Sequence, residues 1–330
     1  MEINGKKFVV IGGAGLIGSH TVDALIKEDV GEVVIYDNFT RGREDNIAEA
    51  LKDPRVKVYD VGGDILQKDI LDSALKGKDG VFHFAALWLL QCHEYPHSAF
   101  DVNVRGTFNV MESCVANNVQ RLVYSSSASV YGDALTEPMK EDHPFNNKNF
   151  YGATKICGEA MLSAYHFRYA LNYVGLRYMN VYGPRQDYKG AYIAVIMKML
   201  DAIDNGEAPS IMGDGSEALD FVAVEDCARA NICAMKSDAV DKNYNVGTGV
   251  KTTLKELAEM IVELTECDKD IQYIERSAAT LVRNRIGCPE NAKNDLDYFY
   301  KIDLRNGLKK LIEWRKNHIK ELEKRKLQIL

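Results

Sequence analysis

The chain of 330 residues has a hydrophobic content of 46% and a formal net charge of −7. It is long enough to bury one large core or two smaller ones, and its negative charge argues against nucleic acid as the main partner. Its seven cysteines are scattered and include no Cys-x-x-Cys pair, which favours a reducing compartment. No secretory signal or membrane-spanning run is recognisable, so we expect a cytoplasmic protein without a membrane partner.

Short apolar runs alternate with amphipathic stretches of helical length in the first half of the chain. The runs that we predict as strands are Phe8–Ile11, Val33–Tyr36, Val56–Tyr59, Val81–Phe84, Leu122–Ser125 and Tyr173–Arg177. Strands that are apolar on both faces and alternate with helices predict an α/β fold, with a doubly wound parallel sheet of the Rossmann type.

Glycine and proline interrupt the chain more often beyond about Asn180, which we interpret as a smaller C-terminal substrate-binding domain. The predicted boundaries are 1–180 plus about 220–250 for the dinucleotide-binding domain, and 181–219 with 251–330 for the substrate-binding domain. Phe221–Val224 should return to the first domain. The basic C-terminal end carries Leu308, Leu311, Ile312, Ile319 and Leu322 near helical spacing. This favours a packed terminal helix over a membrane-surface helix.

A glycine-rich loop, Gly12-Gly13-Ala14-Gly15-Leu16-Ile17-Gly18, follows the first predicted strand. In a strand–loop–helix unit of this kind, one glycine makes the tight turn and another lets the backbone approach a pyrophosphate. A third lets the helix pack on the strand. The start of the helix adds free N–H groups and the positive end of its dipole. The residues that we expect to bind dinucleotide phosphates are therefore Gly12, Gly15, Leu16, Ile17 and Gly18.

Asp37 ends the second predicted strand. A carboxylate at this distance from the loop binds the adenosine ribose hydroxyls and repels a 2′-phosphate, which favours NAD over NADP. Arg41 and Arg43 weigh slightly against this, because arginine can accommodate that phosphate. Further cofactor contacts are expected at the carboxyl ends of strands: Asn38, Asp64, Ile65, Phe84, Ala85 and Ala86. For Ala85 and Ala86, simple tight packing is an equally good explanation.

Tyr151 and Lys155 are four residues apart, so both side chains would lie on one face of a helix. A nearby ammonium and a nicotinamide cation would lower the tyrosine pKa from its usual value of about 10. Ser125-Ser126-Ser127 ends an apolar strand, where a hydroxyl could bind the same substrate oxygen. Ser127, Tyr151 and Lys155 are therefore the expected general acid–base set of a hydroxyl-oxidising, NAD-dependent enzyme.

The segment His93-Glu94-Tyr95-Pro96-His97 matches the His-Glu-x-x-His pattern of zinc proteases. That chemistry requires both histidines on one continuous helix. Pro96 lacks an N–H and clashes with the preceding turn, and no third ligand is evident. We therefore expect a loop here and no metal site.

With these motifs, the chain resembles the extended short-chain dehydrogenases/reductases over nearly its whole length. Among them it is most similar to sugar-nucleotide epimerases and dehydratases. UDP-glucose 4-epimerase-like proteins are the most similar group. The segments that carry the resemblance are the glycine loop, Tyr36-Asp37-Asn38, His83-Phe84-Ala85-Ala86, Asn103-Val104-Arg105-Gly106-Thr107, Ser125 to Gly132, Tyr151-Gly152-Ala153-Thr154-Lys155 and Arg177 to Arg185. The resemblance implies that Tyr151 is the base, Lys155 its partner and Ser127 the hydroxyl that binds the sugar oxygen. It also implies that Asn180 and Tyr192 contact the substrate, and that Asn103, Ser125 and Tyr178 lie at the cofactor.

The dehydratases of this group have a sequence like Thr-Asp-Glu just after the serine strand. This chain has Ser127-Ala128-Ser129 there, with no carboxylate. The resemblance therefore implies an epimerase similar to UDP-glucose or UDP-glucuronate 4-epimerases, and a homodimer. Such enzymes oxidise the sugar at C4, let the keto sugar rotate and return the hydride to its other face. A dehydratase or decarboxylase of the same fold, or a non-catalytic NAD-binding module, remains an alternative.

One departure concerns the substrate phosphates. Relatives usually carry Thr-Arg-Asp-Phe where this chain has Ala218-Leu219-Asp220-Phe221, and that arginine grips the phosphates. Leu219 cannot do so. Either another basic residue replaces it, with Arg276, Arg283 and Arg285 as candidates, or the substrate differs.

Overall fold

The predicted strands assemble into one parallel sheet in the computed structural model, which describes residues 1–186, 194–275 and 282–318. Its seven strands run in the order β11-β6-β5-β4-β1-β2-β3. They are β1 (Lys7–Ile11), β2 (Glu32–Tyr36), β3 (Val56–Val58), β4 (Gly80–His83), β5 (Arg121–Ser127), β6 (Tyr173–Tyr178) and β11 (Lys242–Val246). The six predicted strands and the doubly wound α/β fold are confirmed.

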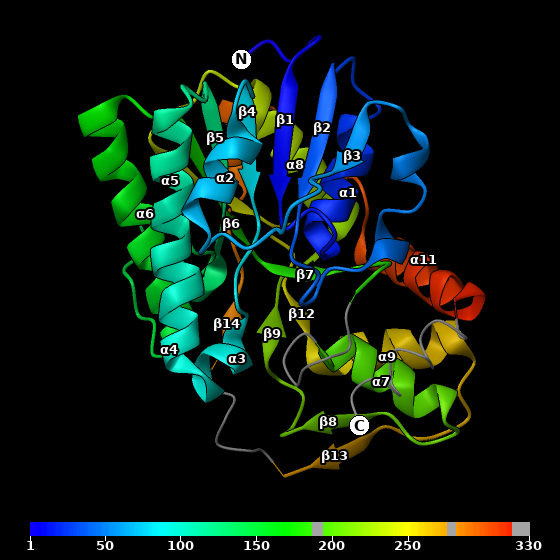
Figure 1. Cartoon of the computed structure of the whole chain (residues 1–330). Helices are drawn as coiled ribbons and strands as arrows, with labels where there is room; N and C mark the ends of the chain where they lie inside the picture. The colour runs from blue at the N-terminus through cyan, green and yellow to red at the C-terminus, as the bar shows by residue number, and fades with distance from the viewer. Residues whose placement is uncertain (187–193, 276–281, 319–330) are drawn as a thin grey trace.

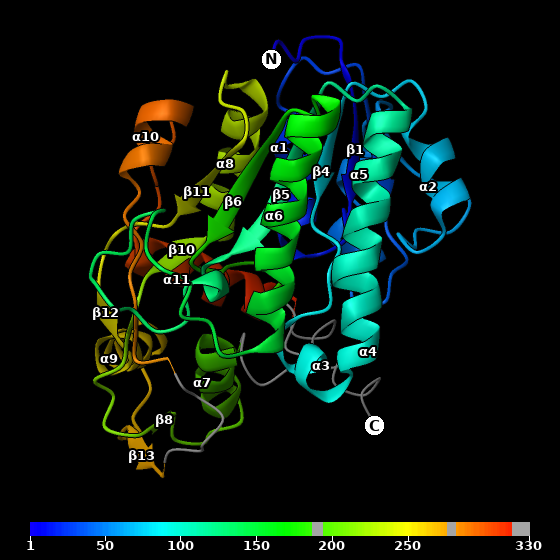
Figure 2. The ribbon, with the colours of Figure 1, turned by 90° about the vertical axis from the view of Figure 1, so that its left-hand side faces the viewer.

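Alternating side chains direct each strand into two helical layers. In β1, Phe8 and Val10 enter one apolar cluster, and Val9 and Ile11 enter the other. Helices α1 (Leu16–Leu25) and α8 (Val224–Lys236) cover the first face, and α2 (Lys68–Leu75), α5 (Thr107–Ala116) and α6 (Phe150–Tyr169) cover the second (Figures 1 and 2). The chain moves outward from β1 to β3 and then resumes at β4, so the carboxyl ends of β1 and β4 form the switch point where such sheets bind ligands.

The seventh strand, β11, pairs in parallel with β6 and was missing from the sequence prediction. Its sequence, Lys-Asn-Tyr-Asn-Val, lacks the apolar run of the other strands. Asn245 is nevertheless buried there, because hydrogen bonds satisfy its side-chain amide. The segment expected to return to the first domain does so only through α8. The preceding β10 (Phe221–Ala223) pairs instead with β7 (Asn180–Tyr182), outside the central sheet.

A third apolar cluster is formed by elements that lie below the carboxyl edge of the sheet (Figure 1). Its elements include α7 (Ala194–Asp204), β8 (Ser210–Met212), α9 (Leu254–Thr265) and α11 (Leu304–Asn317), and β13 (Gln272–Ile274) pairs with β8. A small sheet, β12-β9-β14, joins β9 (Ala218–Leu219) to β12 (Thr252–Thr253) and β14 (Asn284–Arg285). The two-domain boundaries stay a proposal, since Phe221 and Ala223, assigned to the first domain, also belong to this cluster.

The predicted terminal helix exists as α11, and Leu308, Leu311 and Ile312 are buried in the third cluster. Ile319 and Leu322 lie outside the described residues. None of the helices in the described ranges is long and apolar enough to cross a membrane.

The segment after β4 is helical, which corrects the predicted loop. It forms α3 (Leu89–Glu94), α4 (Pro96–Ala99) and a π-helical stretch over Phe100–Gly106. The helix breaks at Tyr95, immediately before Pro96, so His93 and His97 lie on different helices. Within residues 1–186, 194–275 and 282–318, no three His, Cys, Asp or Glu residues are grouped as metal ligands would be. The remaining elements are α10 (Glu290–Leu296) and the short 3-10 turns Glu44–Asn46, Ala50–Lys52 and Ala128–Val130.

Candidate active site

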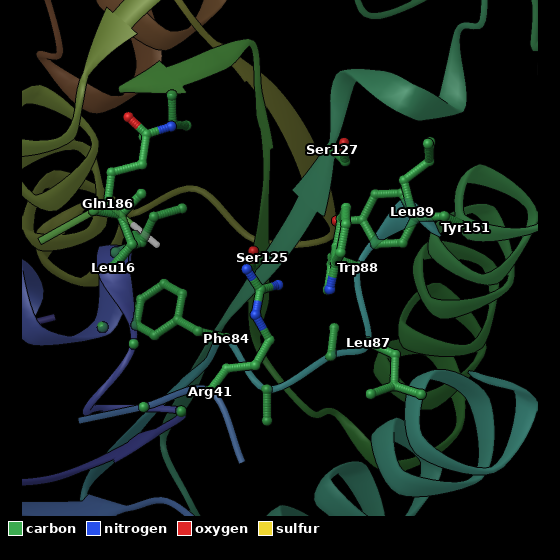
Figure 3. A pocket seen from close by; sticks show the side chains of 18 of the residues that line it. Leu16, Arg41, Phe84, Leu87, Trp88, Leu89, Ser125, Ser127, Tyr151 and Gln186 are labelled. Atoms are coloured by element: carbon green, nitrogen blue, oxygen red, sulfur yellow. The ribbon is translucent and has the colours of Figure 1, made fainter. Parts of the chain in front are cut away.

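A cavity of about 630 Å³ opens at the switch point of the sheet. It extends from the glycine loop after β1, past the ends of β4 and β5, to Leu219 and Arg285 of the small sheet. Residues from both proposed domains therefore line one continuous cavity, part of which Figure 3 shows.

The glycine loop has the geometry of a phosphate cradle. Gly12 has a φ of +77°, and a Cβ atom there would lie 2.8 Å from the Ala85 nitrogen. At Gly18 a Cβ would lie 2.1 Å from the Gly12 oxygen, so this glycine permits close helix packing. At Gly15 a Cβ would meet only the Gly12 oxygen, at 3.3 Å. Helix α1 begins at Leu16 without a side-chain cap, which leaves its first N–H groups to a ligand.

Asp37 lies at the carboxyl end of β2 and lines the same cavity as Asn38, Asp64 and Ile65. Its carboxylate accepts hydrogen bonds from the backbone nitrogens of Ala14 and Phe39, both at 2.8 Å. Burial raises the pKa of Asp37, although these two hydrogen bonds act in the opposite direction. The carboxylate is thus fixed beside the cradle, where it can accept ribose hydroxyls.

Arg185 is a cavity residue that the sequence prediction did not include among the contacts. Its Nη2 lies 2.7 Å from Asp23 Oδ2 on α1, and its Nη1 is buried without a hydrogen-bond partner among the described residues. A buried guanidinium donor in the cavity lining suits an anionic ligand. Together with the cradle and Asp37, it shows that the residues present fit a dinucleotide.

The structure brings Ser127, Tyr151 and Lys155 together at the cavity wall. Ser127 ends β5, and Tyr151 lies in the first turn of α6, which Asn149 caps by accepting from the Gly152 nitrogen at 2.8 Å. The Ser127 side chain lies beside Tyr151 and acts to lower the pKa of its phenol. Lys155 Nζ donates to the Ser125 carbonyl oxygen at 2.7 Å and lies 5.7 Å from the centre of the Tyr151 ring.

Burial dominates the acid–base properties of this group. It raises the pKa of Tyr151 to about 12, although the Ser127 side chain and the charges of Arg41 and Arg285 lower it. Burial also lowers the pKa of Lys155 to about 8. In the protein without cofactor, desolvation of the phenolate outweighs the nearby cations, and the expected lowering of the tyrosine pKa, which includes the nicotinamide cation, stays a prediction.

An apolar wall was missed by the sequence analysis. Leu87, Trp88 and Leu89 line the cavity beside Tyr151. Arg41 reaches across the cavity, and its guanidinium carbon lies 5.1 Å from the centre of the Trp88 ring (Figure 3). The position of these residues, directly after Phe84-Ala85-Ala86 at the end of β4, was a signal that could have identified them.

Two expected cofactor residues do not line the cavity. Asn103 is buried behind it, where its Oδ1 accepts from the Leu87 nitrogen at 2.7 Å and its Nδ2 donates to Thr154 Oγ1 at 3.1 Å. Tyr178 points into the core, because its hydroxyl donates to Asn231 Oδ1 at 2.6 Å. Both support the cavity wall from behind.

The expected substrate residues are divided in the same way. Asn180 lines the cavity and donates to the Asp220 carbonyl at 3.0 Å, whereas Tyr192 lies outside the described residues. Of the three candidate arginines, Arg285 lines the cavity, Arg283 does not, and Arg276 lies outside the described residues. Other predicted contacts that line the cavity are Leu16, Ile17, Phe84, Ala85, Ala86 and Ser125.

Comparisons with known proteins agree with this site. The profile of the NAD dependent epimerase/dehydratase family matches residues 8–247. The UDP-glucose 4-epimerase of Mycolicibacterium smegmatis is 32% identical over 94% of this chain and 98% of its own length. The UDP-N-acetylglucosamine 4-epimerase of Methanobrevibacter ruminantium, solved with UDP-N-acetylmuramic acid, is 34% identical with a TM-score of 0.90, covering 96% of this chain and all of the other.

The UDP-glucose 4-epimerase of Thermus thermophilus, solved with NAD, has a TM-score of 0.83 at 28% identity, covering 94% of this chain and 99% of the other. A UDP-glucuronic acid decarboxylase of Arabidopsis thaliana and a dTDP-glucose 4,6-dehydratase of Actinoplanes also match, each at 28% identity. With its glycine cradle, its Asp37 and this family match, the chain belongs to the NAD-dependent epimerase/dehydratase family of sugar-nucleotide enzymes.

Proposed function

We propose that this protein is an NAD-dependent 4-epimerase of a nucleotide-activated sugar. The observation that carries the proposal is that Ser127, Tyr151 and Lys155 lie together on the wall of the same cavity as the glycine cradle. A sugar hydroxyl placed between the Ser127 and Tyr151 oxygens would have one partner to hold it and one to exchange its proton.

In the proposed reaction, the Tyr151 oxygen takes the proton of the C4 hydroxyl while the Ser127 hydroxyl holds the same oxygen. NAD held by the glycine cradle and Asp37 would supply the hydride acceptor and donor for C4, and its cationic ring would favour the ionised phenol. Lys155 stays fixed by the Ser125 carbonyl and contributes positive charge next to Tyr151. After the keto sugar turns, Tyr151 returns its proton to the C4 oxygen, so the product differs from the substrate only in configuration.

The distribution of acidic residues supports epimerisation rather than loss of water. Among the described residues that line the cavity, the carboxylates are Asp37 and Asp64, which follow β2 and β3. Beyond Ser127 the chain continues with the buried Ala128 and Ser129. A dehydratase needs an additional acid and base near the sugar, and no described carboxylate of the cavity lies on β5 or α6 to act as one.

The test incubates the purified protein with a panel of UDP- and dTDP-sugars and follows interconversion of the 4-epimers. Water loss would appear as a 4-keto-6-deoxy sugar, and decarboxylation of a uronate as a pentose. Tyr151→Phe should fold normally and lose about 10²- to 10⁴-fold in rate, because the general base is removed. Tyr165→Phe, on the same helix but hydrogen bonded to Glu112 outside the cavity, is the matched control and should keep the parent rate. Parent-like rates in Tyr151→Phe would overturn the proposal.

We also retain the homodimer and the cytoplasmic location as proposals. Helices α5 and α6 lie side by side on the outside of the sheet (Figure 2). Their surface exposes Phe108 and Tyr169, and both rings contact Tyr165 between them. Exposed aromatic clusters of this kind often mark protein interfaces. Light scattering of the parent and of Tyr169→Asp tests this surface, since a dimer that uses it should dissociate in the variant.

A further inference from the structure

Helix α6 and strand β5 meet at successive turns of the helix. Tyr151 lies beside Ser127 at the cavity wall, and Lys155 donates to the Ser125 carbonyl. One turn further, Glu159 Oε1 accepts a hydrogen bond from Ser126 Oγ at 2.5 Å. The proposed reaction uses the first two contacts. The third lies behind the cavity, because neither Ser126 nor Glu159 lines it.

Glu159 is held on its other side by a buried arginine at the end of β6. Arg177 Nε donates to Glu159 Oε1 at 2.9 Å and Nη2 donates to Oε2 at 2.7 Å, and both side chains are 5% exposed. A two-pronged ion pair fixes direction as well as distance. Such a pair is weak evidence for stability, because burying both charges costs about as much as their attraction returns. A geometric role explains it better.

Arg177 also connects Glu159, through further hydrogen bonds, to the segment that carries Arg285. Its Nη1 donates to the Tyr131 hydroxyl at 2.8 Å, and that hydroxyl donates to Asn245 Oδ1 at 2.7 Å. Asn245 Nδ2 in turn donates to the Cys288 carbonyl at 3.2 Å. Cys288 lies three residues beyond Arg285, which lines the cavity. The network therefore links α6, β5, β6, β11 and the strand segment that carries Arg285.

We propose that Glu159, held by Arg177 and Ser126, is a positioning residue that fixes α6 on β5 so that Tyr151 meets Ser127 and Lys155 meets the Ser125 carbonyl. This inference rests on the proposed function, since it concerns the base of that reaction. Loss of the third contact would let α6 shift along β5, and a displacement of about 1 Å at a catalytic group can cost about 100-fold in rate.

The carboxylate also acts on Lys155 through its charge. The titratable groups that face Lys155 are Tyr151 and Glu159 on α6, Tyr124 on β5, Cys92 on α3 and His83 on β4. Burial lowers the pKa of Lys155 to about 8, while Cys92 and Glu159 raise it. Glu159→Gln removes a negative charge and leaves the positive charge of Arg177 uncompensated. The pKa of Lys155 should then fall further, and the alkaline limb of activity should move to lower pH.

The experiment compares Ser126→Ala and Glu159→Gln with the parent as NAD-loaded enzymes. Both variants should lower kcat by about 10- to 100-fold while the substrate KM changes less than about threefold, because the cavity wall is intact. Only Glu159→Gln should also move the alkaline limb. The control is Arg121→Lys, which alters a buried arginine at the opposite end of β5 that donates to the Ala234 carbonyl at 2.9 Å. It should leave kcat, KM and the pH profile unchanged.

Parent-like kcat in Ser126→Ala and a parent-like pH profile in Glu159→Gln would overturn the inference. If Glu159→Gln does not fold, Ser126→Ala decides, because it removes one hydrogen bond and leaves the ion pair in place. Tyr151→Phe separates the two proposals. An active Tyr151→Phe removes the proposed function, whereas an inactive one beside parent-like Ser126→Ala removes only the role of Glu159.

Discussion

Two glycines of the cradle should respond to the same substitution in opposite ways. A methyl group on Gly15 would meet only the Gly12 oxygen, at 3.3 Å, and would otherwise enter the cavity. A methyl group on Gly18 would lie 2.1 Å from the Gly12 oxygen and 2.8 Å from the Gly13 Cα, and both are backbone atoms. Gly15→Ala should therefore weaken NAD binding, and Gly18→Ala should weaken the fold.

The expected magnitudes follow from these distances. Overpacking costs about 1–3 kcal/mol, so a methyl group between the Gly15 backbone and the pyrophosphate should raise the Kd of NAD about 5- to 150-fold. At Gly15 the loss of a good N-cap and the gain in chain stiffness nearly cancel, so unfolding should change by less than about 1 kcal/mol. At Gly18 a clash with backbone of about 3 kcal/mol exceeds the gain of about 1 kcal/mol in helix propensity. The net loss is about 2 kcal/mol.

The assay combines calorimetric titration of NAD with urea unfolding of the cofactor-free protein, for the parent and both variants. Gly15→Ala should separate binding from stability, with a raised Kd and a parent-like unfolding midpoint. A parent-like Kd in Gly15→Ala would refute the placement of the pyrophosphate at this glycine. A Gly18→Ala protein as stable as the parent would show that the loop moves away from the helix at no cost.

Three further predictions concern the cavity and the buried histidines. The purified protein should carry NAD, measured in the supernatant after denaturation, because the reaction regenerates the cofactor; NADP in its place would contradict the role of Asp37. Leu219→Arg should change the substrate KM and leave NAD content unaltered, since Leu219 lines the cavity away from the glycine loop; an unchanged KM across the sugar-nucleotide panel would exclude Leu219 from the substrate region. Burial lowers the pKa of both His20 and His83 to about 3, so unfolded histidines take up protons first and the free energy of unfolding should fall as pH drops from about 6.5 toward 3. Urea unfolding at pH 7 and pH 5 measures this loss, which His83→Gln should reduce.

The central sheet was predictable because its strands have a distinctive chemistry. Most of them are apolar runs that are largely buried, and the glycine loop fixes where the first one ends. The seventh, β11, buries Asn245, and the hydrogen-bond partners that satisfy this side chain are distant in sequence. Similarly, the short helices after β4 are too brief to show a helical period.

The site was predictable where one local segment carries it, as for the Tyr151 and Lys155 helix. The site was not predictable where a property of a side chain depends on how the fold buries it. The sequence places Tyr151 beside Lys155, but the desolvation that raises the pKa of the phenol depends on how the whole fold surrounds it. Asn103 and Tyr178 show the same limit, since each stands close in sequence to cavity residues and yet turns its polar group inward.

The replacement of an arginine by Leu219 has a structural context that no single segment shows. Leu219 in β9 lies directly opposite Arg285 in β14, in a parallel register, and both line the cavity. The wall that lacks one positive charge at Leu219 therefore has another on the neighbouring strand. Arg285 also lowers the pKa of Tyr151, as Arg41 does from the opposite side. Leu219→Arg would place two cations side by side, and like charges on adjacent strand positions repel. Any gain in phosphate contact must exceed that repulsion, which is why a change in KM is expected and its direction depends on the nucleotide sugar.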